Sequence, residues 1–160
     1  MTAADSRPTV PSGPRGPRQR KDNTLERLVR DDHVWVATAD ATTGEPCLVP
    51  LSFWWDGRTV WLATRDTTPT GRNLRAPGRA RLAFGHSRDV VLVHGSARRV
   101  PREELPATVG DAFAAKRGWD PRQDHPSYVF FQITPEVVRA WRTGSEMAGQ
   151  TLMTGGQWRA

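Results

Sequence analysis

Residues 48–85 read LVPLSFWWDGRTVWLATRDTTPTGRNLRAPGRARLAFG, and they carry the strongest signals of the fold. Two apolar runs, CLVPLSFWW and RTVWLAT, flank Asp56-Gly57, a pair typical of a tight β-hairpin turn. Pro50 lies inside the first run, where it cannot donate a ladder hydrogen bond. It therefore indicates an edge strand or a bulge. The stretch thus begins with two antiparallel strands joined by a hairpin.

An insert rich in arginine and threonine follows the second strand. Pro69 is placed like the first residue of a helix, with Thr67 or Thr68 as its cap. The hydroxyls of these threonines and of Thr70, together with the guanidinium of Arg72, are donors suited to a phosphate group. A capped surface helix with solvated arginines explains the same composition equally well. Composition alone leaves both interpretations open.

The rest of the chain continues the pattern of hairpins. Short helices are expected at NTLERLVRDD and at REELPATVGDAFAAKRGW, the second interrupted at Pro106. Further strands are expected at HVWVATA, ARLAFG, DVVLVHGSARRV and SYVFFQI, and TPEVVRAW forms a last ordered element before a polar tail. Five or six strands with few helices favour a mainly β fold, an antiparallel barrel.

Composition and charge indicate one basic domain. The chain has 160 residues and a formal net charge of +6, which favours an anionic partner such as a nucleic acid, a membrane surface or a phosphorylated small molecule. Half of the positive excess lies in the first 22 residues. Residues 1–21 hold four prolines and almost no large apolar side chain, so they predict a disordered basic arm. The predicted barrel domain spans 22–143, and 144–160 forms a tail packed on the barrel or on a partner.

Several classes of protein and site are not indicated. Cys47 is the single cysteine, so an internal disulfide is excluded and a reducing cytoplasm is the expected location. The sequence has no apolar run of about 18 residues and no secretory signal, so no membrane association is expected. The four histidines lack the spacing of a metal site, so none is predicted. His94 alternates with Val90 and Leu92, which favours a half-buried histidine over a haem ligand.

The order and spacing of these pieces resemble a known superfamily. The VPLSFWWDG hairpin, the strand ending in Ala63-Thr64 and the TPTGRNL helix start resemble the split β-barrel flavoproteins of the pyridoxamine 5'-phosphate oxidase-like superfamily. The chain is most similar to their actinobacterial branch, the flavin/deazaflavin oxidoreductases, from about His33 to Trp141. The ending AGQTLMTGGQWRA is also similar to that branch.

The resemblance implies a homodimer that holds F-420 or FMN between its subunits and reduces a small conjugated or aromatic organic substrate. Trp54 or Trp55 could form a wall of the substrate pocket, because adjacent strand residues face opposite sides. Many relatives carry a lysine where this chain has Thr70, followed here by Gly71, which leaves the choice between the two cofactors open. The implied cofactor-binding residues are Thr67, Thr68, Thr70, Arg72 and Asn73 around the phosphate, Leu51, Ser52, Phe53, Leu62, Ala63 and Thr64 along the ring and ribityl chain, and Arg65 as a second anion contact.

Two other functions fit parts of the sequence. A non-catalytic cofactor-binding or haem-binding protein could use the same barrel. A nucleic-acid-binding protein could use the basic arm and residues 65–81, but the sequence lacks interleaved exposed aromatics and a recognition-helix motif. The expected partners are therefore a second copy of the chain and a small molecule, not a nucleic acid or a membrane.

Overall fold

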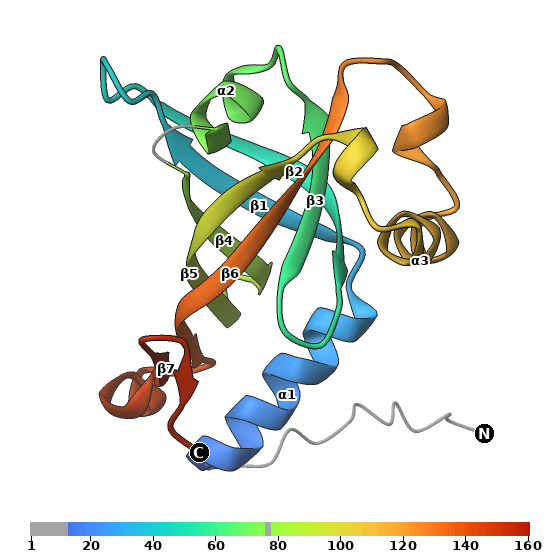
Figure 1. Ribbon diagram of the computed structural model, residues 1–160. Coiled ribbons are helices and arrows are strands. Elements are labelled where there is room, and N and C mark those ends of the chain that lie inside the picture. The colour runs from blue at the N-terminus through green and yellow to red at the C-terminus, as the bar shows by residue number, and fades with distance from the viewer. Residues whose placement is uncertain (1–12, 76–77) are drawn as a thin grey trace, which may run out of the picture.

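The computed structural model describes residues 13–75 and 78–160 (Figure 1). Its strands form one antiparallel sheet in the order β3-β2-β1-β4-β5-β6-β7-β8, and β3 pairs with β6 as well. This extra pairing closes the first six strands into a barrel, so the predicted mainly β, antiparallel barrel is confirmed. The strands are β1 (His33–Ala39), β2 (Pro46–Trp55), β3 (Val60–Arg65), β4 (Arg79–His86), β5 (Asp89–Val100), β6 (Tyr128–Trp141), β7 (Thr151–Thr154) and β8 (Gln157–Trp158).

Three α-helices and three short 3-10 helices complete the described chain. The α-helices are α1 (Pro17–Arg30), α2 (Pro69–Arg75) and α3 (Ala107–Arg117), and the 3-10 helices span Arg102–Glu104, Pro121–Gln123 and Gly144–Gly149. Of the helices described, none is long and apolar enough to cross a membrane.

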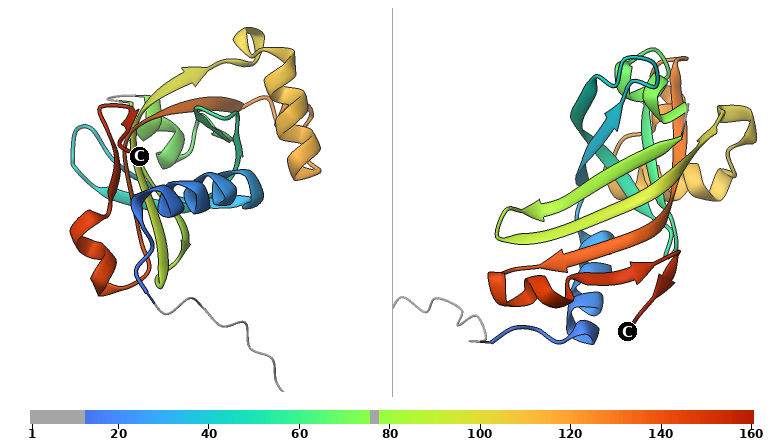
Figure 2. Two further views of the ribbon diagram at one scale, coloured as in Figure 1. Left: turned by 90° about the horizontal axis from the view of Figure 1, so that it is seen from below. Right: turned by 90° about the vertical axis from the view of Figure 1, so that its left-hand side faces the viewer.

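The barrel interior is the main core. Alternate apolar residues of the strands point inward, as the two-residue period of a β-strand requires. Phe53 and Phe84 meet there edge to face, with ring centroids 5.1 Å apart. Leu74 of α2 closes one end of this core, and Leu28 packs into it from α1, which runs across the underside of the barrel (Figure 2).

A second, smaller apolar cluster lies outside the barrel, beneath α3. Phe113 of α3 packs on Phe130 of β6, with ring centroids 5.4 Å apart, and Trp61 and Ala63 of β3 complete the contact. The outer face of β3 is therefore covered by the helix that Figure 1 shows beside it.

The first helix begins earlier than the sequence indicates. The expected start was Asn23, but α1 begins at Pro17, so residues 17–21 of the predicted arm are helical. The reason is a tertiary contact: Arg20 is buried and donates hydrogen bonds to the carbonyl oxygens of Ala140 and Glu146 at 3.5 and 3.1 Å. Residues 1–12 of the arm lie outside the described residues.

The C-terminal part of the chain also differs from expectation. SYVFFQI and TPEVVRAW are one 14-residue strand, β6. Pro135 is accommodated within it because it pairs with Gly95 beside a shift in register between His94 and Gly95. Within residues 144–160, β7 and β8 extend the sheet, and Leu152 enters the barrel core.

Candidate cofactor site

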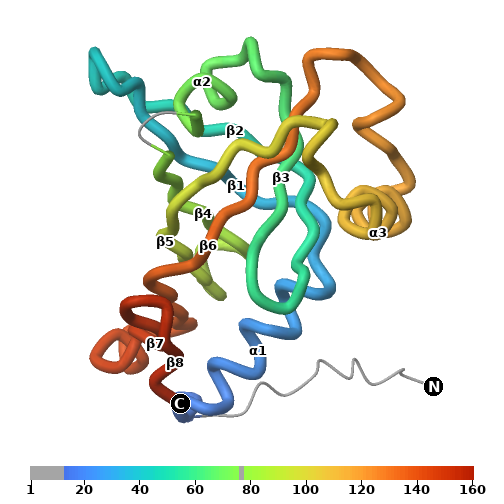
Figure 3. Tube along the Cα trace, in the orientation of Figure 1, coloured from blue at the N-terminus to red at the C-terminus, as the bar shows by residue number. Residues whose placement is uncertain are grey.

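The barrel is split between β2 and β3. Beyond the hairpin, residues 46–52 of β2 pair with β1, and residues 63–65 of β3 pair with β6. In Figure 3 the two strands leave their shared hairpin and diverge towards α2. From Ser52 towards the start of β2, the edges of β2 and β3 therefore face each other without hydrogen bonds between them. The pairs that do join the two strands are Phe53 with Leu62, Trp54 with Trp61 and Trp55 with Val60.

The free edge of β2 carries backbone groups that a ligand can use. The backbone N–H of Phe53 donates to the carbonyl oxygen of Asp32 at 3.2 Å, towards β1. Because successive residues of a strand direct these groups to opposite sides, the N–H of Ser52 and the carbonyl oxygens of Ser52 and Pro50 point to the split. The missing N–H of Pro50 also falls on this side, where no neighbouring strand needs it. The edge position predicted for Pro50 is confirmed.

The ring-lining residues expected from the sequence flank this split. Continuing the β2–β3 register places Ser52 opposite Ala63 and Leu51 opposite Thr64. Leu51 and Ser52 are half-buried, whereas Ala63 packs in the cluster beneath α3. Phe53 and Leu62 are fully buried in the barrel core, so neither side chain reaches the split, and the backbone N–H of Phe53 is bonded towards β1.

Trp54 and Trp55, the expected pocket walls, lie on opposite faces of β2. Trp55 packs in the barrel core, and Trp54 packs against the cluster beneath α3. The predicted alternation is confirmed, while the role of either indole in a substrate pocket stays a prediction.

Helix α2 lies at the end of the split and is fixed to β3 by its cap. The Thr68 hydroxyl donates to the Arg65 carbonyl oxygen at 2.9 Å and accepts from the Gly71 N–H at 3.1 Å. Thr64 Oγ1 lies 3.4 Å from Thr68 Oγ1. A Cβ atom at Gly71 would lie 2.3 Å from the Arg65 carbonyl oxygen, so this close approach requires glycine.

The polar residues of α2 divide between two faces. Thr70 and Asn73 are buried in the protomer, and a role of either residue at a phosphate stays a prediction. Thr70 Oγ1 lies 3.4 Å from Cys47 Sγ, and the amide of Asn73 donates to Thr38 Oγ1 at 3.1 Å. The physical reason is the helical period, which turns these two residues towards β1 and β2. They anchor α2 on the barrel.

Both arginines expected at the phosphate are exposed near the end of the split. Arg72 projects from α2 and donates to the carbonyl oxygen of Thr67 in the preceding loop. Arg65, at the end of β3, lies over the ring of Tyr128 at 5.4 Å from its centroid. Both guanidinium groups are accessible to an anion. Thr67 is exposed in the same loop.

An ion pair missed by sequence reasoning holds the loop between β3 and α2. Arg99 of β5 donates to Asp66 Oδ2 from Nη2 at 2.6 Å and to Oδ1 from Nε at 3.2 Å. These hydrogen bonds hold the pKa of Asp66 below its usual value, and the charges of Arg99 and Arg75 act in the same direction. The signal in the sequence was the single acidic residue in the arginine-rich insert.

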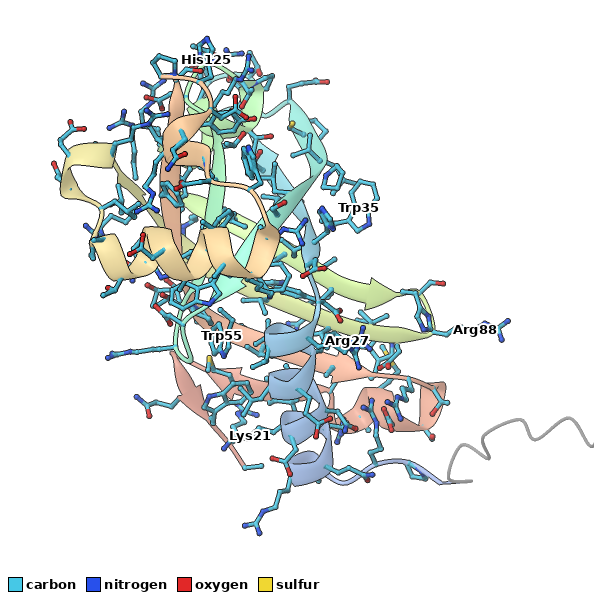
Figure 4. All side chains as sticks on the ribbon, turned by 90° about the vertical axis from the view of Figure 1, so that its right-hand side faces the viewer. Lys21, Arg27, Trp35, Trp55, Arg88 and His125 are labelled. Atoms are coloured by element: carbon cyan, nitrogen blue, oxygen red, sulfur yellow. The ribbon has the colours of Figure 1, made fainter. Side chains whose placement is uncertain are left out.

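The outer face of β1, β2 and β4 beside the split is uncovered and partly apolar. Trp35 is 48% exposed and Leu48 is 62% exposed. Trp35 lies between Pro50 and Ala83 in the register, and Figure 4 shows its indole projecting away from the barrel. A hollow of about 590 Å³ adjoins it. Among the described residues, no group of three or more histidine, cysteine or acidic side chains could hold a metal ion.

A closed barrel split between β2 and β3, with a short helix at the end of the split, defines a split β-barrel protein. The chain belongs to the pyridoxamine 5'-phosphate oxidase family, whose model matches residues 21–142. A sequence comparison with curated proteins finds no significant match.

Solved structures share the fold. They include ChuZ of Campylobacter jejuni (TM-score 0.72, 12% identity, covering 91% of this chain and 66% of that one). HutZ, the haem storage protein of Vibrio cholerae, gives a TM-score of 0.65 at 18% identity, covering 73% of this chain and 90% of that one. An F420 reductase gives a TM-score of 0.59 at 18% identity, covering 71% of this chain and 93% of that one. Membership of the actinobacterial F-420 branch stays a prediction.

Proposed function

We propose that the protein is a homodimeric oxidoreductase that binds F-420 or FMN at the split between β2 and β3 and reduces a small conjugated or aromatic organic substrate. The observation that carries this proposal is the free edge of β2, with α2 and the exposed Arg72 at its end. A flavin-type ring needs hydrogen bonds along its polar edge and a cation at its phosphate, and this arrangement offers both.

Each part of the site has a distinct task in this proposal. Backbone groups of Ser52 and Pro50 hydrogen-bond the ring edge, and Arg72 and Arg65 hold the phosphate. Thr67 contributes a hydroxyl, while Thr68 keeps the loop in place through its cap. The bound cofactor would supply the hydride chemistry, so the chain needs no acid–base pair of its own.

A second copy of the chain would cover the uncovered outer face. Trp35 and Leu48 expose apolar surface beside the split, and contiguous apolar surface of this kind marks interaction sites. A partner packed on this face would also enclose a ring bound along the edge of β2. In this proposal, dimer formation therefore completes the cofactor site.

Calorimetric titration of FMN and F-420 into wild type and Arg72→Ala tests the proposal. If Arg72 holds the phosphate, its loss weakens binding by roughly 10- to 150-fold, which corresponds to about 1.5–3 kcal/mol for a charge-assisted hydrogen bond. Arg88→Ala is the matched control, because Arg88 lies at the far tip of the β4–β5 hairpin (Figure 4). Unchanged affinity in Arg72→Ala would remove Arg72 from the site, and binding of neither cofactor would overturn the function.

A second candidate is a non-catalytic haem-binding or cofactor-binding protein on the same barrel. His94 is half-buried on β5, and burial, with the charges of Arg81 and Arg139, lowers its pKa, so the imidazole is neutral and available as a ligand. The fold likeness to HutZ makes this test worthwhile. Haem titration of wild type and His94→Ala, followed by the Soret band, distinguishes the two candidate functions. A Soret band that is lost in His94→Ala, in a protein without reductase turnover, favours the second candidate.

A further inference from the structure

We propose that a hollow between the start of α1, the tip of the β4–β5 hairpin and the 3-10 helix Gly144–Gly149 binds the carboxylate group of a small organic acid. The hollow measures about 1160 Å³, and residues of all three segments line it. Figure 1 shows these segments at the opposite end of the barrel from α2. The hollow is therefore a second ligand site, and its assignment does not depend on the proposed function.

Three arginines and two carboxylates meet at this hollow, so positive charge is in excess. Asp89 Oδ2 lies 2.6 Å from Arg27 Nη2, and Asp89 Oδ1 lies 3.2 Å from Arg142 Nε. Glu146 Oε2 lies 2.9 Å from Arg15 Nη2. The side chains of Arg15 and Arg27 are only 6% and 12% exposed, so water screens the remaining positive charge weakly. One further carboxylate would balance the network.

Other charged groups nearby are paired or hydrated. Asp31, which also contacts Arg27 at 3.3 Å, has Arg30 at 3.1 Å as a second partner. His86 and Arg88 line the hollow but are exposed, so water and salt screen their charges. Neither group removes the positive excess of the buried network.

Arg142 presents the donors that would hold the carboxylate. Its Nε faces Asp89, and its backbone N–H donates to Glu146 Oε2 at 2.8 Å, so the residue is fixed at both ends. Among the residues that the structure describes, no hydrogen-bond partner is found for its Nη1 and Nη2 groups, although its side chain is only 34% exposed. The parallel N–H groups of a guanidinium match the two oxygens of a carboxylate.

The start of α1 adds backbone donors in the same hollow. The N-cap residue Gly16 has no side chain to accept a hydrogen bond, and the first turn contains no acidic residue. The N–H groups of Arg18 and Gln19 therefore have no partner within the helix. Because Gln19 lines the hollow, the positive end of the helix dipole lies beside it and adds to the attraction of Arg142 for an anion.

Charge and size favour a carboxylate over the alternatives. A carboxylate carries one negative charge, which equals the excess of the buried network, whereas a phosphate monoester carries about −1.5 to −2 at pH 7. A neutral group would form hydrogen bonds only about half as strong with the Arg142 guanidinium. The hollow exceeds the range of about 300–1,000 Å³ typical of small-molecule sites, so it has room for the rest of an organic acid.

NMR titration of the whole protein with three probes that share one alkyl chain tests the assignment. Hexanoate carries the carboxylate, hexanamide is its neutral counterpart, and hexyl phosphate carries the larger charge. We expect hexanoate to bind wild type most tightly, and Arg142→Gln to weaken its binding by at least about 10-fold, the value of a charge-assisted hydrogen bond. Arg88→Ala is the control. It removes an exposed arginine from the same hollow and should change hexanoate binding by less than about 2-fold.

Gln19→Glu tests the site without touching the arginine network. An acidic residue in the first turn stabilises a helix, so this variant should unfold at the wild-type temperature or above it. Its carboxylate would compete with the ligand for the same donors, so hexanoate binding should weaken. In ¹H–¹⁵N spectra of wild type, hexanoate should shift the backbone amide signal of Gln19 and leave that of Arg72, at the split, unchanged.

Four results would overturn the assignment. They are no binding of hexanoate at about 10 mM, binding of hexanamide or hexyl phosphate as tight as that of hexanoate, equal losses in Arg142→Gln and Arg88→Ala, and a shift of the Arg72 signal without one of Gln19. Equal losses in the two arginine variants would show a general attraction of anions and no held carboxylate.

Discussion

Glu146→Gln tests how the N-terminal segment is attached to the barrel. Glu146 is 4% exposed, and its carboxylate accepts hydrogen bonds from Arg15 N, Nε and Nη2 at 2.8, 3.1 and 2.9 Å and from Arg142 N at 2.8 Å. These groups lower its pKa from 4.5 to about 2, with the Arg15 side chain as the main cause. An amide cannot accept as many charge-assisted bonds, so the substitution leaves Arg15 partly unpaired.

The pKa shift of Glu146 sets an upper limit on the stability lost in Glu146→Gln. A shift from 4.5 to about 2 corresponds to at most about 3 kcal/mol, at 1.36 kcal/mol per pH unit. Because glutamine keeps the shape of the side chain and one acceptor oxygen, part of the hydrogen bonding survives, and we expect a loss of about 1.5–3 kcal/mol at pH 7. Because the folded pKa is depressed, this stability is fully present above pH 4.5 and is lost as the pH falls through about 2.

Urea unfolding of wild type and Glu146→Gln at pH 7, 5 and 3 measures the free energy of unfolding. The difference between the two proteins should be largest at pH 7 and 5 and should shrink at pH 3. Glu103→Gln is the control, because Glu103 is exposed on a 3-10 helix. A difference below about 0.5 kcal/mol at pH 7, the size of an ordinary surface substitution, would show that the Glu146 carboxylate does not stabilise the fold through Arg15. So would a difference that stays constant down to pH 3.

Two further predictions concern α2 and the outer face. Gly71→Ala should lower the free energy of unfolding by about 1–3 kcal/mol, because its Cβ would lie 2.3 Å from the Arg65 carbonyl oxygen. Thermal unfolding measures this loss. An unchanged midpoint would contradict the close approach of Gly71 to Arg65. Leu48→Glu should shift the protein to monomer in sedimentation velocity without destabilising the barrel, because Leu48 is 62% exposed on the proposed dimer face. An unchanged oligomeric state would place the dimer contact elsewhere.

Local signals in the sequence were sufficient for most of the barrel. Asp56-Gly57 marked the β2–β3 hairpin, Pro50 marked a free edge, and Pro69 marked the start of α2, because each is a backbone constraint that acts over a few residues. The start of α1 could not be predicted in this way. It depends on Arg15 and Arg20 reaching residues 120 or more positions away, and such contacts leave no local pattern.

The candidate site was predictable in location and only partly in detail. The resemblance indicated both sides of the split and the helix at its end. It did not indicate which side chains face inward: Thr70 and Asn73, expected around the phosphate, are buried against the barrel, and their role at a phosphate stays a prediction. Two residues were missed for a related reason. Asp66 and Arg99 come from different parts of the chain, and only the closed barrel brings them together.

Spectral titration of the purified protein with FMN and F-420 tests whether the split between β2 and β3 is a cofactor site. We expect at least one of them to bind with a Kd below roughly 10 µM, with one cofactor per subunit of a dimer. Arg72→Ala should weaken this binding, and Arg88→Ala should not. If neither cofactor perturbs the spectrum at tens of micromolar, the split between β2 and β3 is not a flavin-type site, and the proposed oxidoreductase function is wrong.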